Sequence, residues 1–343
     1  MFSLLTFLSP LIGAERSHNA ALFLLRWIGK IPGSKWLMRK MYAVEETALE
    51  RDVFGIHFRN PIGMAAGFDR NGEVFQELGA LGFGFVEIGT VTPQPQQGNP
   101  KPRIFKLPDD KAIMNRVGLS SDGLERVISN IRQSHEGVVI GCNIGKNSAT
   151  APEDAPQDYL RVFRNLYQYA DYFTVNVSYN TSFKQYVPRT RESIISILEP
   201  LFDFRRGQNL YRPILLKISP DLSNEDIDMM TDIMVDTPLD GIVATNGTIR
   251  HTGLTTESEI VKRYGAGAIS GKPLTNRSIE VVRRVYERSN GTYPIIGVGG
   301  IMTPADAVAM LNAGATLVQV YTGYVYNGPN FVGNICKELI NNK

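Results

Sequence analysis

From about residue 60 onward, short apolar segments rich in β-branched residues alternate with longer amphipathic ones. The apolar segments are PIGMAAG at 61, FGFVEIGTV at 83, VVIGCNIG at 138, YFTVNVS at 172, ILLKIS at 214, GIVATN at 241, IIGVGG at 295 and LVQVYTG at 317. Segments between them, such as 158–169 and 224–235, have the length and pattern of crossover helices. Because apolar strands that alternate with helices form a parallel sheet covered on both faces, these units predict an α/β fold, a closed (β/α)8 TIM barrel.

A doubly wound open sheet is the alternative architecture for this alternation. Dinucleotide-binding sheets of that kind carry a GxGxxG turn after the first strand, whereas AAGFDRNGE stands at that place here. We therefore favour a barrel over residues 45–343, preceded by a small helical extension over residues 1–44.

The extension 1–44 differs from the rest of the chain because it is both basic and apolar. It carries six Lys or Arg residues against one acidic residue, Glu15. None of its apolar runs approaches the ~20 residues needed to cross a bilayer, and it lacks the basic start and cleavage site of a signal peptide. Apolar residues recur at helical spacing between Ala21 and Ile28, which predicts short amphipathic helices. Such helices either pack on their own domain or rest on a membrane surface.

The composition limits the classes of function. With 43% hydrophobic and 20% charged residues, the 343-residue chain has the composition of a globular protein. A net charge of +2 argues against a nucleic-acid surface over the whole molecule, and we expect no nucleic-acid partner. Cys142 and Cys336 stand far apart without a CxxC spacing, so neither a disulfide framework nor a metal site is indicated.

Polar residues and glycines stand at the carboxyl ends of the predicted strands, where barrel enzymes place their chemistry. In chain order they are Gly67, Asp69, Arg70, Thr90, Asn143, Lys146, Asn176, Lys217, Asn246, Gly299, Gly300, Tyr321 and Thr322. Amides, hydroxyls and lysine in a barrel mouth need hydrogen-bonding partners, which predicts a polar ligand.

Lys217 lies inside an apolar strand, where an unpaired ammonium group is costly. Either a carboxylate of the barrel or an anionic ligand compensates its charge. Gly299 and Gly300 follow the seventh strand, where barrels commonly bind phosphate through backbone N–H groups. A phosphate-bearing ring system with many hydrogen-bonding groups fits flavin mononucleotide (FMN), whereas the NAD fingerprint is missing.

Several motifs carry a resemblance to a known family. They are NPIGMAAGFD, GFGFVEIGTVTPQPQQGNPKPRIFKL, NRVGL, NIGKN, LLKISPDLS, GIVATN, SGKPL, PIIGVGGI and GATLVQVYTG. In number and order they resemble the quinone-linked, class 2 dihydroorotate dehydrogenases over nearly the whole chain. The resemblance includes AERSH in the extension, which is similar to the family's small helical domain at the quinone entrance.

The resemblance implies an enzyme of de novo pyrimidine (UMP) biosynthesis that oxidises dihydroorotate to orotate. FMN takes a hydride from C6 of the substrate, a base removes the C5 proton, and a membrane quinone accepts the electrons. The implied protein is peripheral, on the cytoplasmic side of the inner cell membrane, and we expect it to be a monomer.

Site residues follow from the resemblance position by position. Those implied for the cofactor are Ala66, Gly67, Phe68, Asp69, Arg70, Thr90, Asn143, Asn176, Lys217, Thr245, Gly271, Gly300, Tyr321 and Thr322. Those implied for the substrate are Arg70, Asn115, Arg116, Val117, Gly118, Leu119, Asn176, Asn180, Thr181, Asn246 and Gly247. His18 and Lys106 are implied for the quinone, although the family usually has Arg at the second position.

The stretch VNVSYNTSFKQY departs from the family's base loop, which reads Asn-x-Ser-Ser-Pro-Asn with the second Ser as the base. Aligned without a gap, Tyr179 stands at the base position, next to Ser178, and Thr181 replaces the second Asn. With one residue deleted, Asn180 keeps its role instead. The catalytic candidates are therefore Tyr179, Ser178 and Lys217, and a tyrosine base needs a lowered pKa to act at neutral pH.

Other positions also depart from the family. Arg70 replaces a lysine, and Gly247 removes a threonine hydroxyl from the substrate side. Cys142 lies in the third predicted strand, so the cysteine base of the cytosolic class 1 is absent from the loop. Three interpretations stay open: an active dihydroorotate dehydrogenase, a related FMN barrel with another substrate, and a flavin-binding barrel that has lost catalysis.

Overall fold

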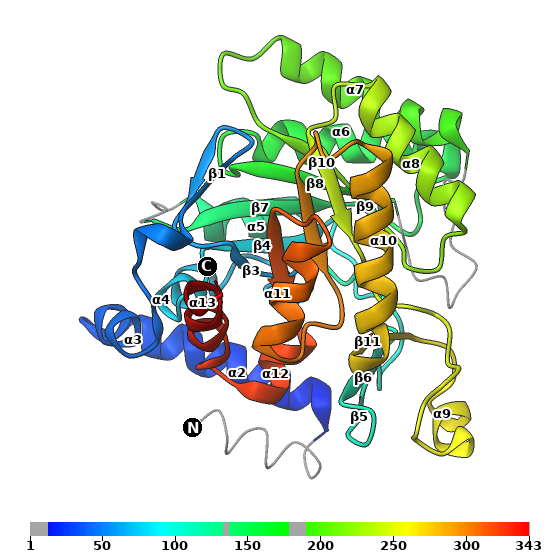
Figure 1. Ribbon diagram of the computed structural model, residues 1–343. Coiled ribbons are helices and arrows are strands. Elements are labelled where there is room, and N and C mark those ends of the chain that lie inside the picture. The colour runs from blue at the N-terminus through cyan, green and yellow to red at the C-terminus, as the bar shows by residue number, and fades with distance from the viewer. Residues whose placement is uncertain (1–12, 133–136, 178–189, 343) are drawn as a thin grey trace.

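Eight parallel strands close into a barrel in the computed structural model, which describes residues 13–132, 137–177 and 190–342 (Figure 1). Around the barrel the strand order is β10-β12-β13-β3-β4-β7-β8-β9. The strands are β3 (Ile62–Met64), β4 (Phe85–Val91), β7 (Val139–Ile144), β8 (Tyr172–Asn176), β9 (Ile214–Ile218), β10 (Gly241–Ala244), β12 (Ile295–Val298) and β13 (Leu317–Val320). Each lies within a predicted strand, and the predicted (β/α)8 barrel is confirmed.

The barrel is closed by pairing of its last strand with its first. Val318 of β13 pairs with Ile62 of β3, and Val320 pairs with Met64. The amino-terminal half of the interior is a buried cluster that includes Phe85, Tyr172, Leu215, Ile296 and Leu317. A hairpin of β1 (Arg51–Val53) and β2 (Ile56–Phe58) adds Val53 and Phe58 to this cluster. This end of the barrel is therefore filled, which leaves the carboxyl ends of the strands for a site.

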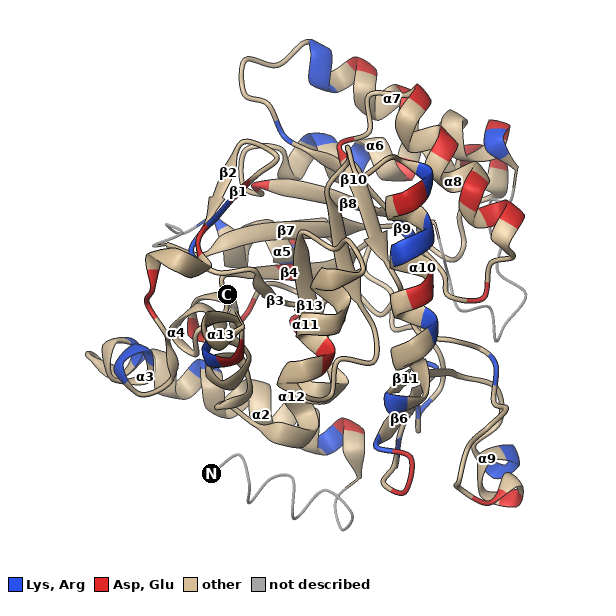
Figure 2. Cartoon of the chain, in the orientation of Figure 1, with Lys and Arg blue, Asp and Glu red and all other residues tan. Residues whose placement is uncertain are grey.

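Helices cover the outside of the barrel. They are α4 (Phe75–Ala80), α5 (Leu124–Ile131), α6 (Ala155–Leu166), α7 (Arg191–Arg206), α8 (Asn224–Asp236), α10 (Thr275–Arg288), α11 (Pro304–Asn312), α12 (Thr322–Asn327) and α13 (Phe331–Asn341). Thr190, Ser223 and Thr303 are N-caps whose hydroxyls accept backbone N–H groups of the first turns of α7, α8 and α11. Arg284 and Arg288 of α10 pair with Asp228 and Asp232 of α8. Figure 2 shows the acidic and basic positions along these two helices.

An antiparallel sheet that the hydrophobic pattern did not predict stands beside the barrel mouth. It has the order β11-β6-β5 and consists of β5 (Ile104–Leu107), β6 (Ala112–Asn115) and β11 (Ala268–Gly271). The described part of the chain after residue 44 also contains the short helix α9 (Ser258–Tyr264) and the 3-10 turns η1 (Thr47–Leu49), η2 (Pro152–Asp154) and η3 (Lys272–Leu274). Asp110, between β5 and β6, accepts backbone N–H groups of Thr255 and Thr256 and so holds the loop before α9.

The helices predicted in the extension are α2 (Ala14–Gly29) and α3 (Ser34–Tyr42). Both pack against α4, and α2 also contacts β5, so they lie against the barrel (Figure 1). The two helices and the turn between them expose Phe23, Trp27, Ile31, Trp36, Leu37 and Met41, a set called the apolar patch below. Within the described part of the chain, no helix has the length and apolar content to span a bilayer.

Candidate functional site

A cavity of about 310 Å³ opens at the carboxyl ends of the barrel strands. Its walls come from the strand ends, the sheet β11-β6-β5 and α2. The predicted residues that line it are Ala66, Gly67, Phe68, Arg70, Thr90, Asn176, Lys217, Thr245, Gly271, Gly300, Tyr321 and Thr322 from the cofactor set, Asn115, Arg116, Val117, Gly118, Leu119, Asn246 and Gly247 from the substrate set, and His18 and Lys106 from the quinone set. The fold therefore brings residues from all parts of the chain to one cavity.

Some predicted residues are not part of this wall. Asp69 and Asn143 do not line the cavity, although their neighbours in sequence or in space do. The predicted base-loop residues Ser178, Tyr179, Asn180 and Thr181 lie outside the described residues. Their roles remain predictions.

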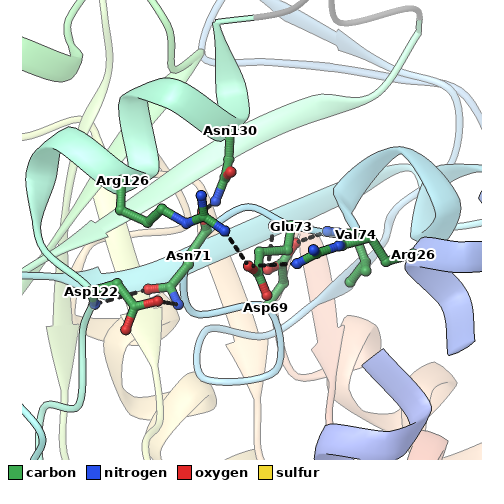
Figure 3. A network of polar contacts seen from close by, with 8 residues as sticks. All are labelled: Arg26, Asp69, Asn71, Glu73, Val74, Asp122, Arg126 and Asn130. Atoms are coloured by element: carbon green, nitrogen blue, oxygen red, sulfur yellow. Dashed lines mark hydrogen bonds and ion pairs between the residues drawn. The ribbon is translucent and has the colours of Figure 1, made fainter. Parts of the chain in front are cut away.

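Asp69 lies in the loop after β3, where Figure 3 shows its contacts, and it does not line the cavity. Its Oδ1 accepts the backbone N–H of Glu73 and its Oδ2 that of Val74, each at 2.8 Å. Burial raises the pKa of Asp69 to about 6, while these backbone donors act in the opposite direction. Both carboxylate oxygens are thus used within the loop, and the cofactor contact expected for Asp69 stays a prediction.

The same loop is attached to helices on both sides (Figure 3). Glu73 contacts Arg26 of α2 at 3.1 Å and Arg126 of α5 at 3.4 Å. Asn71 donates to Asp122 and also accepts the Asp122 backbone N–H. The segment that carries Gly67, Phe68 and Arg70 into the cavity is thus held between the extension and the barrel.

Asn143 belongs to a chain of polar contacts below the cavity. Its Oδ1 accepts the Thr90 hydroxyl at 2.6 Å, and Thr90 in turn accepts the Asn176 Nδ2 at 3.2 Å. The Asn143 Nδ2 donates to Glu87 at 2.8 Å. Asn143 therefore acts on the cavity through Thr90 and Asn176, which line it.

Lys217 faces the cavity and also has a protein partner. Its Nζ lies 3.7 Å from Oε1 of Glu87, in the middle of β4, and the Glu87 carboxylate is fully buried. The sequence left open whether a barrel carboxylate or an anionic ligand compensates the charge of Lys217. The structure shows that a barrel carboxylate is present. We did not predict Glu87, although an acid inside the apolar segment FGFVEIGTV is the same kind of signal as Lys217 in ILLKIS.

Glycines allow the backbone to approach the cavity closely at the end of β11 and after β12. Gly271, Gly299 and Gly300 have φ values of 104°, 117° and 76°, which side chains rarely adopt. A Cβ at Gly300 would lie 2.3 Å from the backbone of Thr275, and one at Gly299 would lie 2.4 Å from the Ser278 hydroxyl. Only glycine fits both the conformation and the space at these positions.

His18 lines the cavity on the wall formed by α2. Its ring packs edge-on against Phe68, with ring centroids 5.0 Å apart. Burial, together with the nearby charge of Arg70, lowers the pKa of His18 to about 4, although a hydrogen bond to the Phe68 backbone raises it. The imidazole is therefore neutral at neutral pH. Its Nε2 is buried and has no hydrogen-bond partner among the described residues.

Lys106 of β5 lines the cavity on the side of α2. Its Nζ lies 5.8 Å from the centroid of the Tyr326 ring, and burial lowers the pKa of its ammonium group. Small and apolar residues, including Ala14, Ala21, Ile104 and Val325, complete this part of the wall. One continuous cavity thus has a polar end among the strands and a more apolar end at the extension.

The fold and this cavity define a class of protein, a (β/α)8-barrel enzyme with room for a cofactor and a polar substrate at the strand ends. The family model described as dihydroorotate dehydrogenase matches residues 48–342. This chain belongs to that family.

Similar proteins span almost the full chain. A "Dihydroorotate dehydrogenase (quinone)" of Christiangramia forsetii is 43% identical over 326 residues, which cover 95% of this chain and 94% of that protein. One from Nocardia farcinica is 43% identical and covers 99% of this chain and 92% of its own length. The crystal structure of DHODH from Eimeria tenella in complex with ferulenol has a TM-score of 0.87 and 32% identity, covering 98% of this chain and 94% of that one.

Proposed function

We propose that this chain oxidises dihydroorotate to orotate in pyrimidine biosynthesis, with FMN as cofactor and a quinone as electron acceptor. The observation that carries the proposal is the single cavity. It joins a ring of amides at the strand ends to a histidine and a lysine beside the extension, so two reactants can reach one cofactor. Membership of the dihydroorotate dehydrogenase family supports the same reaction.

The residues of the cavity fit FMN. The close-packed glycines at 271, 299 and 300 place backbone where a phosphate can approach. Gln319 lines the cavity, and its buried Oε1 has no hydrogen-bond partner among the described residues, so it can accept an N–H of a ring system. Lys217, which also lines the cavity, supplies a positive charge.

Bound FMN supplies the acceptor for a hydride from C6 of the substrate. The protein's part is to bind the planar, carboxylated pyrimidine, whose edges present both donors and acceptors. Amide side chains suit such edges because each offers both kinds of group, and Asn115, Asn176 and Asn246 line the cavity. Arg70 adds a planar guanidinium that can pair with a carboxylate.

Removal of the C5 proton is assigned to the base loop, with Tyr179 at the base position and Ser178 as its neighbour. An ordinary phenol has a pKa near ~10, so Tyr179 needs a nearby cation to act as a base at neutral pH. This assignment rests on sequence position alone.

We further propose that residues 1–44 form a membrane-associating unit and residues 45–343 the catalytic barrel. Support comes from the apolar patch on α2 and α3, where Trp36 is 61% exposed, and from Lys and Arg positions on α3 (Figure 2). Aromatic and basic side chains on one surface are typical of interfacial helices. In this proposal the protein is a peripheral monomer on the cytoplasmic side of the cell membrane, which size measurement and fractionation can test.

The reaction is tested by adding dihydroorotate to the FMN-loaded protein without oxygen. We expect rapid loss of the visible flavin absorbance, followed by its return when a soluble quinone is added. Tight orotate binding with an unchanged spectrum would instead favour a barrel that has lost catalysis. Reduction by another substrate only would favour a different reaction.

The base is tested by Tyr179→Phe, which removes the phenol and keeps the ring. If Tyr179 is the base, reduction by dihydroorotate is lost while orotate binding is retained. An unchanged reduction rate would exclude the phenol, and Ser178→Ala is then the next variant to measure.

A further inference from the structure

Glu87 is a buried carboxylate that neither the pattern nor the family resemblance singled out. It lies in the middle of β4 with no exposed surface. Its carboxylate accepts from Asn143 Nδ2 at 2.8 Å, Gln319 Nε2 at 2.8 Å, Thr174 Oγ1 at 3.1 Å and Tyr172 OH at 3.3 Å, and lies 3.7 Å from Lys217 Nζ. These partners come from β7, β13, β8 and β9, so Glu87 connects its own strand β4 to four other strands of the barrel.

A buried charge is costly unless it is paired and fully hydrogen-bonded. Glu87 meets both conditions, because four donors and one ammonium group surround its two oxygens. Burial, together with the Glu87 charge, raises the pKa of Tyr172, so its phenol stays protonated and donates. The site is therefore built for a carboxylate.

The carboxylate also determines how its amide partners are oriented. Because a carboxylate only accepts, the nitrogens of Asn143 and Gln319 face Glu87 and their oxygens point elsewhere. The Asn143 oxygen accepts from Thr90, which leaves Thr90 to accept from Asn176. The Gln319 oxygen is buried and has no hydrogen-bond partner among the described residues. The Gln319 side chain lines the cavity.

We propose that Glu87 is a positioning residue that compensates the charge of Lys217 and turns acceptor oxygens toward the bound cofactor. It touches neither cofactor nor substrate, since it does not line the cavity, and acts through Lys217, Gln319 and the Asn143–Thr90–Asn176 chain. The inference rests on the proposed function, because it needs a redox cofactor in the cavity. Its consequence is a cofactor reduction potential that depends on the charge of Glu87.

The test measures the two-electron midpoint potential of the FMN-loaded protein by chemical titration, which needs no substrate. Glu87→Gln removes the negative charge beside Lys217, so reduction should become more favourable by about tenfold, a rise of ~30 mV for a two-electron couple. Glu87→Asp keeps the charge and should stay close to the wild-type potential. Equal potentials in Glu87→Gln and the wild type, or equal shifts in both variants, would overturn the inference.

A second pair of variants keeps the test decisive if Glu87→Gln does not fold. Lys217→Gln should lower the potential, and Glu87→Gln/Lys217→Gln, which removes both buried charges, should return it toward the wild-type value. A double variant no higher in potential than Lys217→Gln would show a merely structural role and overturn the inference. Wild-type protein that is reduced by titration but not by dihydroorotate would overturn the proposed function alone, and failure to bind FMN would overturn both.

Discussion

Gly300 shows how tightly a single residue of the cavity wall can be constrained. Its φ of 76° is unfavourable for other residues, and a Cβ would meet the backbone of Thr275 at 2.3 Å. Gly253 has the same φ of 76°, but a Cβ there would have no other atom within 4 Å, so this position isolates the conformational cost.

We expect Gly300→Ala to lower the free energy of unfolding by about 3 kcal/mol, because strain and steric conflict add. Gly253→Ala should cost only about 1 kcal/mol. Denaturant unfolding measures both values, and FMN titration should show weaker binding for Gly300→Ala alone. Equal losses in the two variants would contradict the assigned steric conflict.

His18 makes stability depend on pH. Its pKa in the folded protein is about 4, below the ordinary 6.5, so between these values the unfolded chain binds more protons than the folded one. The free energy of unfolding therefore falls as the pH drops through this window, and the stabilising contribution is complete above about pH 6.5.

Between about pH 7.5 and about pH 4.5, the free energy of unfolding of the wild type falls because of His18. We expect that of His18→Gln to fall by about 1 to 3 kcal/mol less over the same range. Asp69 has a raised pKa and acts in the opposite direction, but it is present in both proteins and cancels in the comparison. Parallel pH profiles of the two proteins in denaturant unfolding would contradict the burial of a neutral imidazole.

At the scale of elements, the extension is both a wall of the cavity and an exposed surface. α2 contributes Ala14, Ser17, His18 and Ala21 to the cavity, while the outer faces of α2 and α3 and the turn between them carry the apolar patch. The contact of Arg26 with Glu73 connects this helix to the loop after β3. If residues 1–44 associate with a membrane as proposed, a change in how α2 and α3 sit on it would act on the end of the cavity proposed for the quinone, because α2 forms a wall there.

Leu37→Gln tests the apolar patch. Leu37 is 53% exposed on α3, and we expect its replacement to weaken binding to lipid vesicles by about three- to tenfold, because less apolar surface is buried at the interface. Leu210→Gln is the matched control, since Leu210 is 49% exposed in the loop after α7. Vesicle flotation measures both, and equal weakening would contradict docking through α2 and α3.

At the scale of the whole molecule, cofactor binding and barrel stability should be linked. The cavity takes residues from seven of the eight barrel strands or the loops that follow them, so a ligand there holds many parts of the fold together. FMN at a hundred times its dissociation constant should raise the free energy of unfolding by about 2.7 kcal/mol. Thermal denaturation at increasing FMN concentration measures this, and a melting temperature independent of FMN would contradict the proposed site.

Much of the barrel could be predicted because its signals are local. A strand buried on both faces must be apolar along its whole length, so each of the eight segments, such as ILLKIS, could be recognised alone. The sheet β11-β6-β5 could not, because β5 is only partly buried and Ala268 of β11 pairs with Asn115 of β6, which is far away in the sequence. Pairing between strands that are distant in the sequence leaves no local pattern.

The sequence by itself determined the barrel, the polar strand ends and the family, since burial and chain turns restrict residue type position by position. Only the tertiary structure decided the partners of those residues. Asp69 follows a strand end like Arg70, yet it binds its own loop, and Lys217 meets Glu87 from a strand that is not its neighbour. The reason is that hydrogen bonds and ion pairs depend on distance and direction between side chains, which exist only once the barrel has closed.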